Sequence, residues 1–508
     1  MRTRNAMYNL AGSLILSIVT AISGLILPRL FITNYGSVTN GLISSGRQFI
    51  EYLSLVEAGI GYASIAMLYT PIKERNHSNV NRILSAAKVQ YEKSGKLFLI
   101  LILLLSLVYP FTVSNQVGWG TAFSMILVLG VGGISEFFLI GKYRVFLTAS
   151  QKGYVIYLAQ AVGVMVNIVV TVILISFKMN PVLLQLIVAI IFVSRFIYLK
   201  KYLEKKYPWV DYNSATDDNI IHSRLDVLIH QIVNLVIVNT PIIIITVFLG
   251  LKEVSIFTIY LLIHNMVIML LSVFMNGFQS IFGDIIAEKD KKILMKNFHL
   301  YEWLFYTIVN IVYVVLSILY IPFIKLYTFG ISDANYIRPH MALLFIIIGL
   351  LHNMRLPYMS ILNSAGLFKK TRNAAIIEAI ISLSLSLYLV NIYQIEGVLL
   401  GWLIAYVFRI VILIKQISVD YVYNSILPTL KLLFLNVLFF VISLLICKQI
   451  SNIEINSFID FIVEGIKLVF VSTSIILLLN FIFYRSELLQ VLSKGTNMLK
   501  ERNEEYKE

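Results

Sequence analysis

Long apolar runs recur along the whole chain, separated by short polar stretches. A helix needs about 20 mostly apolar residues to cross a lipid bilayer, and the runs have that length. This pattern predicts about fourteen membrane-spanning helices, centred near residues 20, 55, 105, 130, 165, 190, 238, 270, 314, 350, 383, 405, 438 and 473.

Two of the predicted spans carry a stripe of polar positions in steps of three, four or seven, which places each stripe on one face of a helix. The two stripes lie about 218 positions apart and follow the same spacing; they are Asn40, Ser44, Arg47, Glu51, Ser54 and Gly61, and Thr258, Asn265, Ser272, Asn276, Gln279 and Gly283. Polar groups in a span are costly unless they face protein or water. Matching stripes in two halves of a chain predict a central aqueous cavity, as in transporters.

Composition agrees with the spacing of the apolar runs. Only 13% of the residues are charged, 58% are hydrophobic, and the mean hydropathy is +0.84. A soluble protein of 508 residues does not keep so much apolar surface from water, so the chain is expected to be an integral membrane protein.

The net charge of +14 would favour nucleic acid as the partner of a soluble chain. Here the basic residues fall mainly in alternate connections between spans, as in Lys73 and Arg75, Lys205 and Lys206, and Lys291 and Lys292. This is the positive-inside pattern, and it predicts that both termini lie in the cytoplasm. A multi-pass chain rich in Ile, Lys and Asn fits a bacterial plasma membrane. No nucleic-acid partner is expected, whereas membrane lipids are.

The fold class expected from these features is an all-α polytopic membrane protein with two lobes of six helices in the same orientation. The predicted divisions are an N-terminal lobe over 1–200, a cytoplasmic linker over 201–222, a C-terminal lobe over 223–416, an additional helix pair over 427–484 and a cytoplasmic tail over 485–508.

Arg47 and Glu51 stand at positions i and i+4 of one span, which leaves two interpretations open. Arg47 faces the cavity and meets an anionic group of a substrate, for which a planar guanidinium is suited. Alternatively, the two side chains neutralise each other as a structural pair. The residues predicted to bind substrate are Arg29, Arg47, Glu51, Ser54, Asn265, Ser272, Asn276, Gln279 and Arg355.

Asp226, His230 and Asn234 lie four residues apart on one face of the seventh span and are candidates for ion coupling, because a carboxylate beside a histidine can carry a proton or a cation. Capping of the helix by Asp226 is the alternative. Glu57 is expected to find a partner on a neighbouring span, and Arg144, Arg195 and Arg409 are expected to contact anionic lipid.

The seven histidines form no metal motif, and the chain has no GxxxxGK[ST] loop for a nucleotide. No catalytic residue, metal or cofactor is predicted. The expected energy source is therefore a gradient, the membrane potential or the concentration difference of the substrate itself, rather than ATP.

The segment LPRLFITNYGSVTNGLISSGRQFIEYLSLVEAGIGYAS, residues 27–64, resembles the N-terminal region of bacterial polysaccharide flippases. These belong to the polysaccharide transport branch of the multidrug/oligosaccharidyl-lipid/polysaccharide exporter superfamily. The resemblance implies two lobes in a V around a cavity that opens alternately to each side of the membrane. It also implies a flippase for undecaprenyl-diphosphate-linked oligosaccharide repeat units, used in capsule, O-antigen or exopolysaccharide synthesis. The diphosphate would be held by cationic residues that match Arg29 and Arg47, and the partners would include a polysaccharide polymerase and glycosyltransferases.

Two other functions remain open on the sequence. A cation-coupled exporter of drugs from the same superfamily is expected to have a cavity dominated by carboxylates, whereas here the second span carries Arg47. A membrane-embedded polysaccharide polymerase usually needs a large outer loop, and the longest one here, near Thr328 to His340, is short. An enzyme is therefore not expected.

Overall fold

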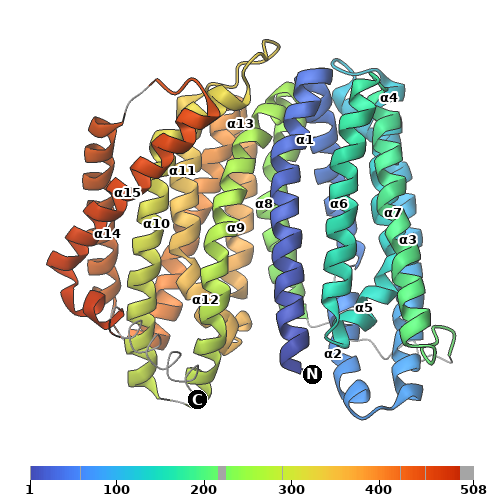
Figure 1. Ribbon diagram of the computed structural model, residues 1–508, viewed down its shortest axis with the longest axis horizontal. Helices are drawn as coiled ribbons and strands as arrows, with labels where there is room; N and C mark the ends of the chain where they lie inside the picture. Colours follow the sequence, from blue (N-terminus) through green and yellow to red (C-terminus); the bar gives the residue numbers. More distant parts are fainter. Residues whose placement is uncertain are drawn as a thin grey trace. The chain divides into compact units, whose positions relative to one another are not determined.

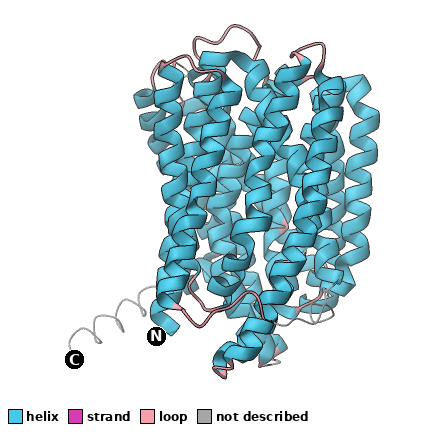
Figure 2. Ribbon diagram, turned by 90° about the vertical axis from the view of Figure 1, so that its right-hand side faces the viewer, coloured by secondary structure: helices cyan, strands magenta, loops and turns pink. Residues whose placement is uncertain are grey.

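The computed structural model describes the chain except for residues 1, 58, 215–224, 289, 424, 452–453, 492 and 494–508; the side chains of 2–3, 225–231, 234, 273–281 and 287 are not described either. Helices connected by short loops make up the described residues, and these residues contain no strand (Figure 2). In chain order the helices are α1 (Arg2–Leu53), η1 (Ser54–Glu57), α2 (Ile60–Lys73), α3 (His77–Val113), α4 (Trp119–Ser135), η2 (Glu136–Ile140), α5 (Gly141–Ala149), α6 (Gly153–Ser176), α7 (Pro181–Lys206), α8 (Leu225–Phe248), α9 (Leu251–Ala287), α10 (Lys291–Tyr327), α11 (Pro339–Met354), α12 (Leu356–Ala365), α13 (Phe368–Leu413), η3 (Ile414–Tyr423), α14 (Leu427–Ile450) and α15 (Phe458–Phe483).

Within the described residues, eleven helical stretches are long and apolar enough to cross a membrane, and α8 contributes a shorter apolar helix. Two of the eleven, Arg4–Glu57 and Phe368–Tyr423, are more than twice the length of one span. Each is broken by a residue with non-helical backbone angles, Gly36 in α1 and Gln394 in α13. If each broken stretch counts as two spans and α8 is added, the total is fourteen spans, the number predicted from the sequence. The all-α polytopic fold is therefore confirmed.

The first polar stripe does not lie on one continuous helix. The α-helix α1 ends at Leu53, the 3₁₀ turn η1 follows, and α2 begins only at Ile60. Gly59 has a φ of 90°, a left-handed conformation that glycine adopts without steric cost and that ends the helical path. The prediction that Gly61 continues the face of Asn40 and Arg47 is therefore wrong.

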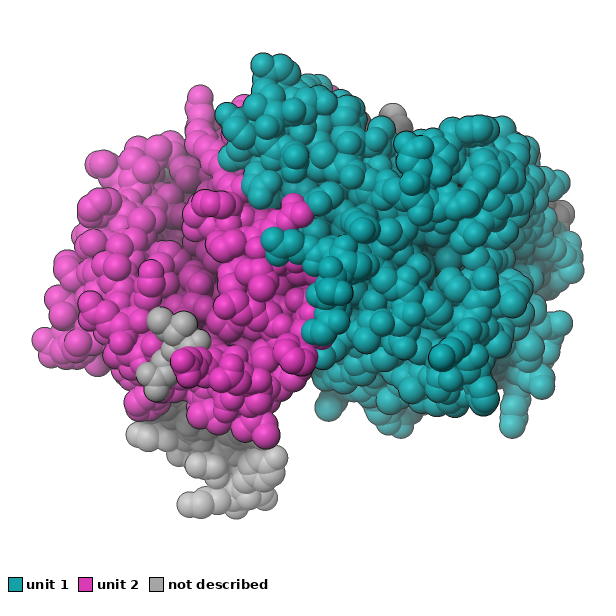
Figure 3. All heavy atoms as spheres, turned by 90° about the horizontal axis from the view of Figure 1, so that it is seen from above, with its two compact units in different colours: residues 1–262, 330–335, 375–402 teal, residues 263–329, 336–374, 403–508 magenta. Residues whose placement is uncertain are grey.

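The chain forms two compact units, coloured separately in Figure 3. Unit 1 comprises residues 1–262, 330–335 and 375–402, and unit 2 comprises 263–329, 336–374 and 403–508. The division into lobes at the predicted boundaries stays a prediction. The start of the predicted linker packs on α3: the Trp209 ring stacks on His77 at 3.8 Å, and the Asn81 amide donates to the Trp209 carbonyl at 3.0 Å.

Each unit packs around a few long helices. In unit 1, α1 lies against α6, α3 against α4, and α6 against α7 (Figure 1). In unit 2, α10 packs against α11, α14 and α15 (Figure 1). Buried polar side chains join these helices: the Asn310 amide donates to Asn436 Oδ1 at 3.0 Å, and the Trp303 indole donates to Asn480 Oδ1 at 2.6 Å. The additional helix pair is thus held to α10 by hydrogen bonds as well as by apolar contacts.

Candidate functional site

Unit 1 contains a hollow of about 310 Å³ between α1, α4, α6 and α7. Helix α1 lines it twice, with Thr20, Ser23 and Leu27 before Gly36 and with Arg47 after it. In a straight helix, Thr20 and Arg47 would lie about 40 Å apart. They line one hollow because the chain changes direction at Gly36, whose φ of 82° and ψ of 168° suit a residue without a side chain.

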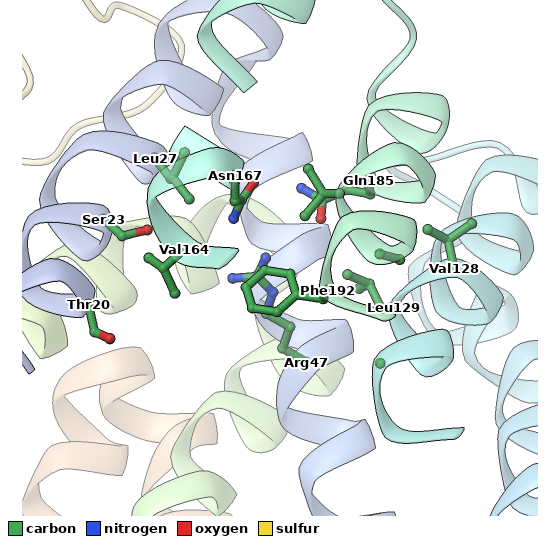
Figure 4. Close-up of a pocket in the computed structure, with 13 residues that line it drawn as sticks. Thr20, Ser23, Leu27, Arg47, Val128, Leu129, Val164, Asn167, Gln185 and Phe192 are labelled. Carbon is green, nitrogen blue, oxygen red and sulfur yellow. The ribbon is translucent and has the colours of Figure 1, made fainter. Parts of the chain in front are cut away.

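Arg47 is the only charged residue among those that line this hollow. Its guanidinium points into the space, toward the level of Asn167 and Gln185 (Figure 4). Among the described residues the guanidinium has no ion pair and no hydrogen-bond partner, so the structural pair with Glu51, one of the two interpretations left open by the sequence, does not form. Glu51 itself is exposed and does not line the hollow.

Polar side chains from three helices surround the guanidinium. They are Thr20 and Ser23 on α1, Asn167 on α6 and Gln185 on α7. Asn167 is 6% exposed and accepts a hydrogen bond from Thr171 Oγ1 at 3.0 Å, which leaves its NH₂ group free to donate. Gln185, 4% exposed, makes no hydrogen bond to the described residues. A guanidinium with nearby amide and hydroxyl donors can hold an anion with several oxygen atoms, such as a phosphate.

A network of four charges lies one helical turn beyond the hollow. Arg195 follows Phe192 on α7 by three positions, and Glu136 follows Gly132 on α4 by four. Arg195 donates to Glu136 Oε2 at 3.1 Å, and Arg144 meets Glu136 Oε1 at 3.1 Å. Arg144 also pairs with Glu57, which accepts from the Tyr91 hydroxyl at 2.9 Å.

This network confirms a partner for Glu57 on another helix. It also shows that the lipid-anchoring role expected for Arg144 and Arg195 is wrong, because both guanidinium groups are used in ion pairs within unit 1. The same expectation is wrong for Arg409, which is 2% exposed and donates to the carbonyl of Thr371 at 3.1 Å.

The other site residues predicted near the first stripe lie outside the hollow. Arg29 is half-buried on α1. Ser54 lies in η1, where its hydroxyl donates to the Glu51 carbonyl at 2.6 Å. Asn40 is buried and donates to Ser255 Oγ at 2.9 Å, which uses this position of the stripe for a contact between helices. Only Arg47 of the predicted substrate residues lines the hollow of unit 1.

Thr258 of the second stripe lies in unit 1, whereas the substrate residues predicted from that stripe, and Arg355, belong to unit 2. Asn265 is exposed, and Ser272 donates to the carbonyl of Met269 at 2.8 Å within its own helix. Arg355 stacks on the Tyr406 ring at 4.2 Å and donates to His352 Nδ1 at 3.0 Å. The side chains of Asn276 and Gln279 lie outside the described residues, as do those of the ion-coupling candidates Asp226, His230 and Asn234. Substrate binding or ion coupling by any of these residues stays a prediction.

Asn167 and Gln185 are two polar residues of the hollow that were not predicted from the sequence. Each is a single amide in an otherwise apolar run, VMVNIVV and LLQLIV, and neither belongs to a stripe. A lone amide in a membrane span is the signal that could have found them, because an unsatisfied amide in lipid is costly.

No protein-family model and no curated protein sequence matches the chain. Several solved structures share its fold. One is an inward-facing multidrug resistance MATE family transporter of the MOP superfamily, with a TM-score of 0.66, 15% identity and coverage of 81% of this chain and 98% of that one. The lipid II flippase MurJ in an inward closed conformation has a TM-score of 0.60 and 17% identity over 93% and 99% of the two chains. The MATE multidrug transporter DinF-BH has a TM-score of 0.58 and 16% identity over 82% and 95%.

The chain shares its fold with these solved structures. Because each similar structure is covered almost completely, the likeness extends through whole chains rather than one helix bundle. About a fifth of this chain has no counterpart in the two MATE structures. The similar structures are transporters and a flippase, and the hollow with Arg47 lies within this fold.

Proposed function

We propose that this chain is a flippase that moves undecaprenyl-diphosphate-linked oligosaccharide repeat units across the bacterial plasma membrane. The observation that carries the proposal is the Arg47 guanidinium, which faces the hollow of unit 1 without a partner among the described residues. A charge left unpaired in a membrane span costs at least about 2.5 kcal/mol on insertion scales, and an anionic ligand would offset that cost.

The hollow suits the polar end of such a substrate. Its volume of about 310 Å³ is at the lower end for small-molecule sites and matches a diphosphate with an adjoining sugar better than a whole repeat unit. The guanidinium would take two phosphate oxygens, while the amides of Asn167 and Gln185 would donate to the remaining oxygens or to sugar hydroxyls. The prenyl chain would stay in the lipid, and alternating access would expose the site to each side in turn.

An exporter of organic cations is the second candidate, because the similar structures include multidrug transporters. The charge in the hollow is unfavourable for binding an organic cation. The hollow's one charged lining residue is Arg47, and a like charge in a site of low dielectric constant repels a cation. The polarity of the hollow therefore favours the anionic lipid-linked substrate.

The proposed flippase is a multi-pass protein of the bacterial plasma membrane with both termini in the cytoplasm. It would act between the glycosyltransferases that assemble the repeat unit and the polymerase that joins repeat units for capsule, O-antigen or exopolysaccharide. The basic connections near Lys73, Lys205 and Lys291 support this orientation through the positive-inside rule. Reporter fusions at each end of the chain measure the orientation directly.

The test compares Arg47→Ala with Arg82→Ala in cells that depend on this protein for surface polysaccharide. Both changes remove one positive charge, but Arg82 is exposed on α3 and lies outside the hollow. At equal protein levels, we expect Arg47→Ala to lose surface polysaccharide and to accumulate lipid-linked repeat units on the cytoplasmic side. Arg47→Lys should keep part of the activity, because lysine retains the positive charge but lacks the planar guanidinium that binds two oxygen atoms at once.

Wild-type surface polysaccharide in the Arg47→Ala strain would remove this residue from the mechanism. Drug sensitivity is measured in the same strains. Increased sensitivity to organic cations on loss of the protein, with unchanged polysaccharide, would favour the drug exporter instead.

A further inference from the structure

Unit 2 contains a buried carboxylate that the proposed flipping mechanism does not use. Glu302 on α10 is 0% exposed. Its Oε1 accepts from the Tyr358 hydroxyl on α12 at 2.5 Å, and its Oε2 accepts from the Tyr423 hydroxyl on η3 at 3.2 Å. Among the described residues no lysine, arginine or histidine lies within ion-pair distance of it. In contrast, the half-buried Glu136 and the buried Glu464 are both paired with a cation.

An isolated carboxylate in a medium of low dielectric constant is neutralised by a proton or by a bound cation. A metal cation would need several oxygen ligands and free lone pairs directed at it. Here both carboxylate oxygens already face hydroxyl donors, and no second carboxylate is present among the described residues of the cluster. This arrangement fits a proton rather than a metal ion.

The hydrogen bonds around Glu302 can accommodate both protonation states. Tyr306 lies within reach of both the Tyr358 hydroxyl, at 3.2 Å, and the carbonyl of Met354, at 2.8 Å. With Glu302 ionised, Tyr358 donates to the carboxylate and Tyr306 donates to Tyr358 or Met354. With Glu302 protonated, its O–H donates to Tyr358, Tyr358 donates to Tyr306, and Tyr306 donates to the Met354 carbonyl. Every hydroxyl keeps an acceptor in either state, so the proton can bind and leave without an orphaned donor.

One end of this chain of hydrogen bonds reaches a second hollow. Tyr423, which donates to Glu302, also lines a space of about 380 Å³ with Lys292, Met295, Lys296, His299 and Pro428. The two lysines are exposed, so this hollow is open to water. A proton from that water has a path through the Tyr423 hydroxyl to the carboxylate.

The other end reaches the break between α11 and α12. The Met354 carbonyl stands at the end of α11, next to Arg355, and Pro357 near the start of α12 interrupts the helix because proline has no N–H to donate. Arg355 donates to His352 Nδ1 at 3.0 Å and to the Tyr406 hydroxyl at 3.2 Å. The chain of hydroxyls therefore ends on a backbone carbonyl beside a candidate substrate residue, where a change in their orientation would alter the hydrogen bond to that carbonyl.

We propose that Glu302 is the proton-binding site through which this protein couples translocation to a proton gradient, with Tyr358, Tyr306 and Tyr423 as its hydrogen-bonded path. The coupling rests on the proposed function, since it needs a transported substrate. The proton-binding site itself does not. Glu302 is a site residue for the proton, and the three tyrosines are positioning residues.

Each element that packs against Glu302 carries other titratable groups. A titration has to distinguish the proton on Glu302 from the protons on these groups. Tyr484, after α15, is near enough to interact electrostatically with Glu302. His299, one turn away on α10, lies 3.4 Å from Glu487. The full set comprises Tyr301, Tyr306, His299, Lys296 and Lys292 on α10, Tyr358 on α12, Tyr423 on η3, and Tyr484 and Glu487 after α15.

The first experiment measures the proton on the carboxyl group without any substrate. Purified full-length protein is titrated with base and followed by infrared difference spectroscopy, in which a protonated carboxyl has its own C=O band. We expect wild type to show a band that disappears at high pH and that is absent from Glu302→Gln. The matched control Glu464→Gln should keep the band, because Glu464 is 8% exposed and pairs with Lys467 at 2.8 Å.

Tyr358→Phe provides a second variant in case Glu302→Gln does not fold. It keeps the carboxyl group but removes its hydrogen-bond partner at Oε1, so the band is expected to move to a higher wavenumber. A band that is unchanged in both variants, or no titrating band in wild type, would overturn the proton site.

The second experiment measures translocation of a lipid-linked substrate in proteoliposomes with and without a pH gradient. We expect the gradient to change the rate in wild type and in Glu464→Gln, and to have no effect in Glu302→Gln. Rates that follow a sodium gradient and ignore pH would overturn proton coupling. If no translocation occurs at all, the proposed function fails, while the infrared band still decides the proton site.

Discussion

Unit 1 has a single charged residue in its hollow and, about one helical turn away, a network of four charged residues, and the two regions differ in whether their charges are paired. In the hollow, Arg47 lies among neutral side chains and has no ion pair within the described part of the chain. Just beyond, Arg195, Glu136, Arg144 and Glu57 form a continuous series of ion pairs. Both regions lie in helical stretches that are long and apolar enough to cross a membrane, and they differ in which side chains their geometry brings together.

A charged side chain that is already in an ion pair has a structural role, whereas one without a partner can bind a ligand. The four-residue network is internally neutral, and each member already has a partner, so it holds η1, η2, α5 and α7 together. Glu136 begins the π-helical segment η2, which turns its carboxylate to a position between the two arginines. Arg47 makes no such connection. Changes in the network should therefore affect stability, and changes in the hollow should affect transport.

The largest effect is expected from Arg144→Met. This change leaves Glu57 with only the Tyr91 hydroxyl and removes one of the two cations at Glu136. Breaking a buried pair by removing one partner costs about 3 to 5 kcal/mol, and partial exposure of this network reduces that to about 2 to 4 kcal/mol. Denaturant unfolding of the purified protein in detergent measures the loss.

A compensating variant tests whether the orphaned carboxylate is the cause. Arg144→Met combined with Glu57→Gln removes the carboxylate that lost its partner, so part of the free energy of unfolding should return. Arg82→Met, a change on the exposed face of α3, should stay within about 0.5 kcal/mol of wild type. A double variant no more stable than Arg144→Met alone would contradict the pairing argument.

The second prediction concerns Arg47, for which we expect a loss of transport without a loss of stability. Arg47→Met leaves no carboxylate without a partner, so the free energy of unfolding should change by no more than about 0.5 kcal/mol. Translocation of the lipid-linked substrate should fall about tenfold or more, because a charge-assisted hydrogen bond contributes about 1.5 to 3 kcal/mol. Measuring both quantities on the same preparation separates the two regions. A strongly destabilised Arg47→Met protein would show that this charge is structural after all.

Most of the fold could be predicted from apolar periodicity, because the bilayer sets the length of each span. The break between α1 and α2 could not. Ser54 to Val56 carry the same mixture of apolar and small polar residues as the flanking helices, and only Gly59 indicates the turn. The change of direction at Gly36 could not be predicted either. A glycine within a long apolar stretch also occurs where a helix continues, as at Gly163 in α6.

The candidate site was predicted less completely. Arg47 is visible in the sequence as an arginine in an apolar run, but its spacing to Glu51 suggested a pair that the side-chain conformations do not form. Glu302 was missed because HLYEWLFY places it near basic residues at the start of a helix, where a carboxylate is ordinary. Its isolation depends on three tyrosines from α10, α12 and η3, which no local pattern reveals.

The third prediction concerns the neutral donors of the hollow. Gln185→Leu preserves volume but removes an amide that has no hydrogen bond to the described residues. If this amide donates to the substrate, its loss should cost about 0.5 to 1.5 kcal/mol, which is up to about tenfold in apparent affinity. Substrate dependence of translocation measures the change. Asn167→Leu should cost stability as well, because Asn167 also accepts from Thr171. An unchanged affinity in Gln185→Leu would restrict recognition to Arg47.

The smallest effect is expected from Ser54→Ala, although Ser54 belongs to the predicted stripe. Its hydroxyl donates to the Glu51 carbonyl at 2.6 Å, so the donor is already used within the same segment, and the residue does not line the hollow. Stability should change by less than about 0.5 kcal/mol, and translocation should equal that of wild type. Ser272→Ala, whose hydroxyl donates to Met269, is the matched change in unit 2 and should behave alike. A clear loss of translocation in either variant, at unchanged stability, would mean that the stripe recognises substrate despite its local hydrogen bonds. The distinction between paired and unpaired groups would then fail for neutral residues and hold only for charged ones.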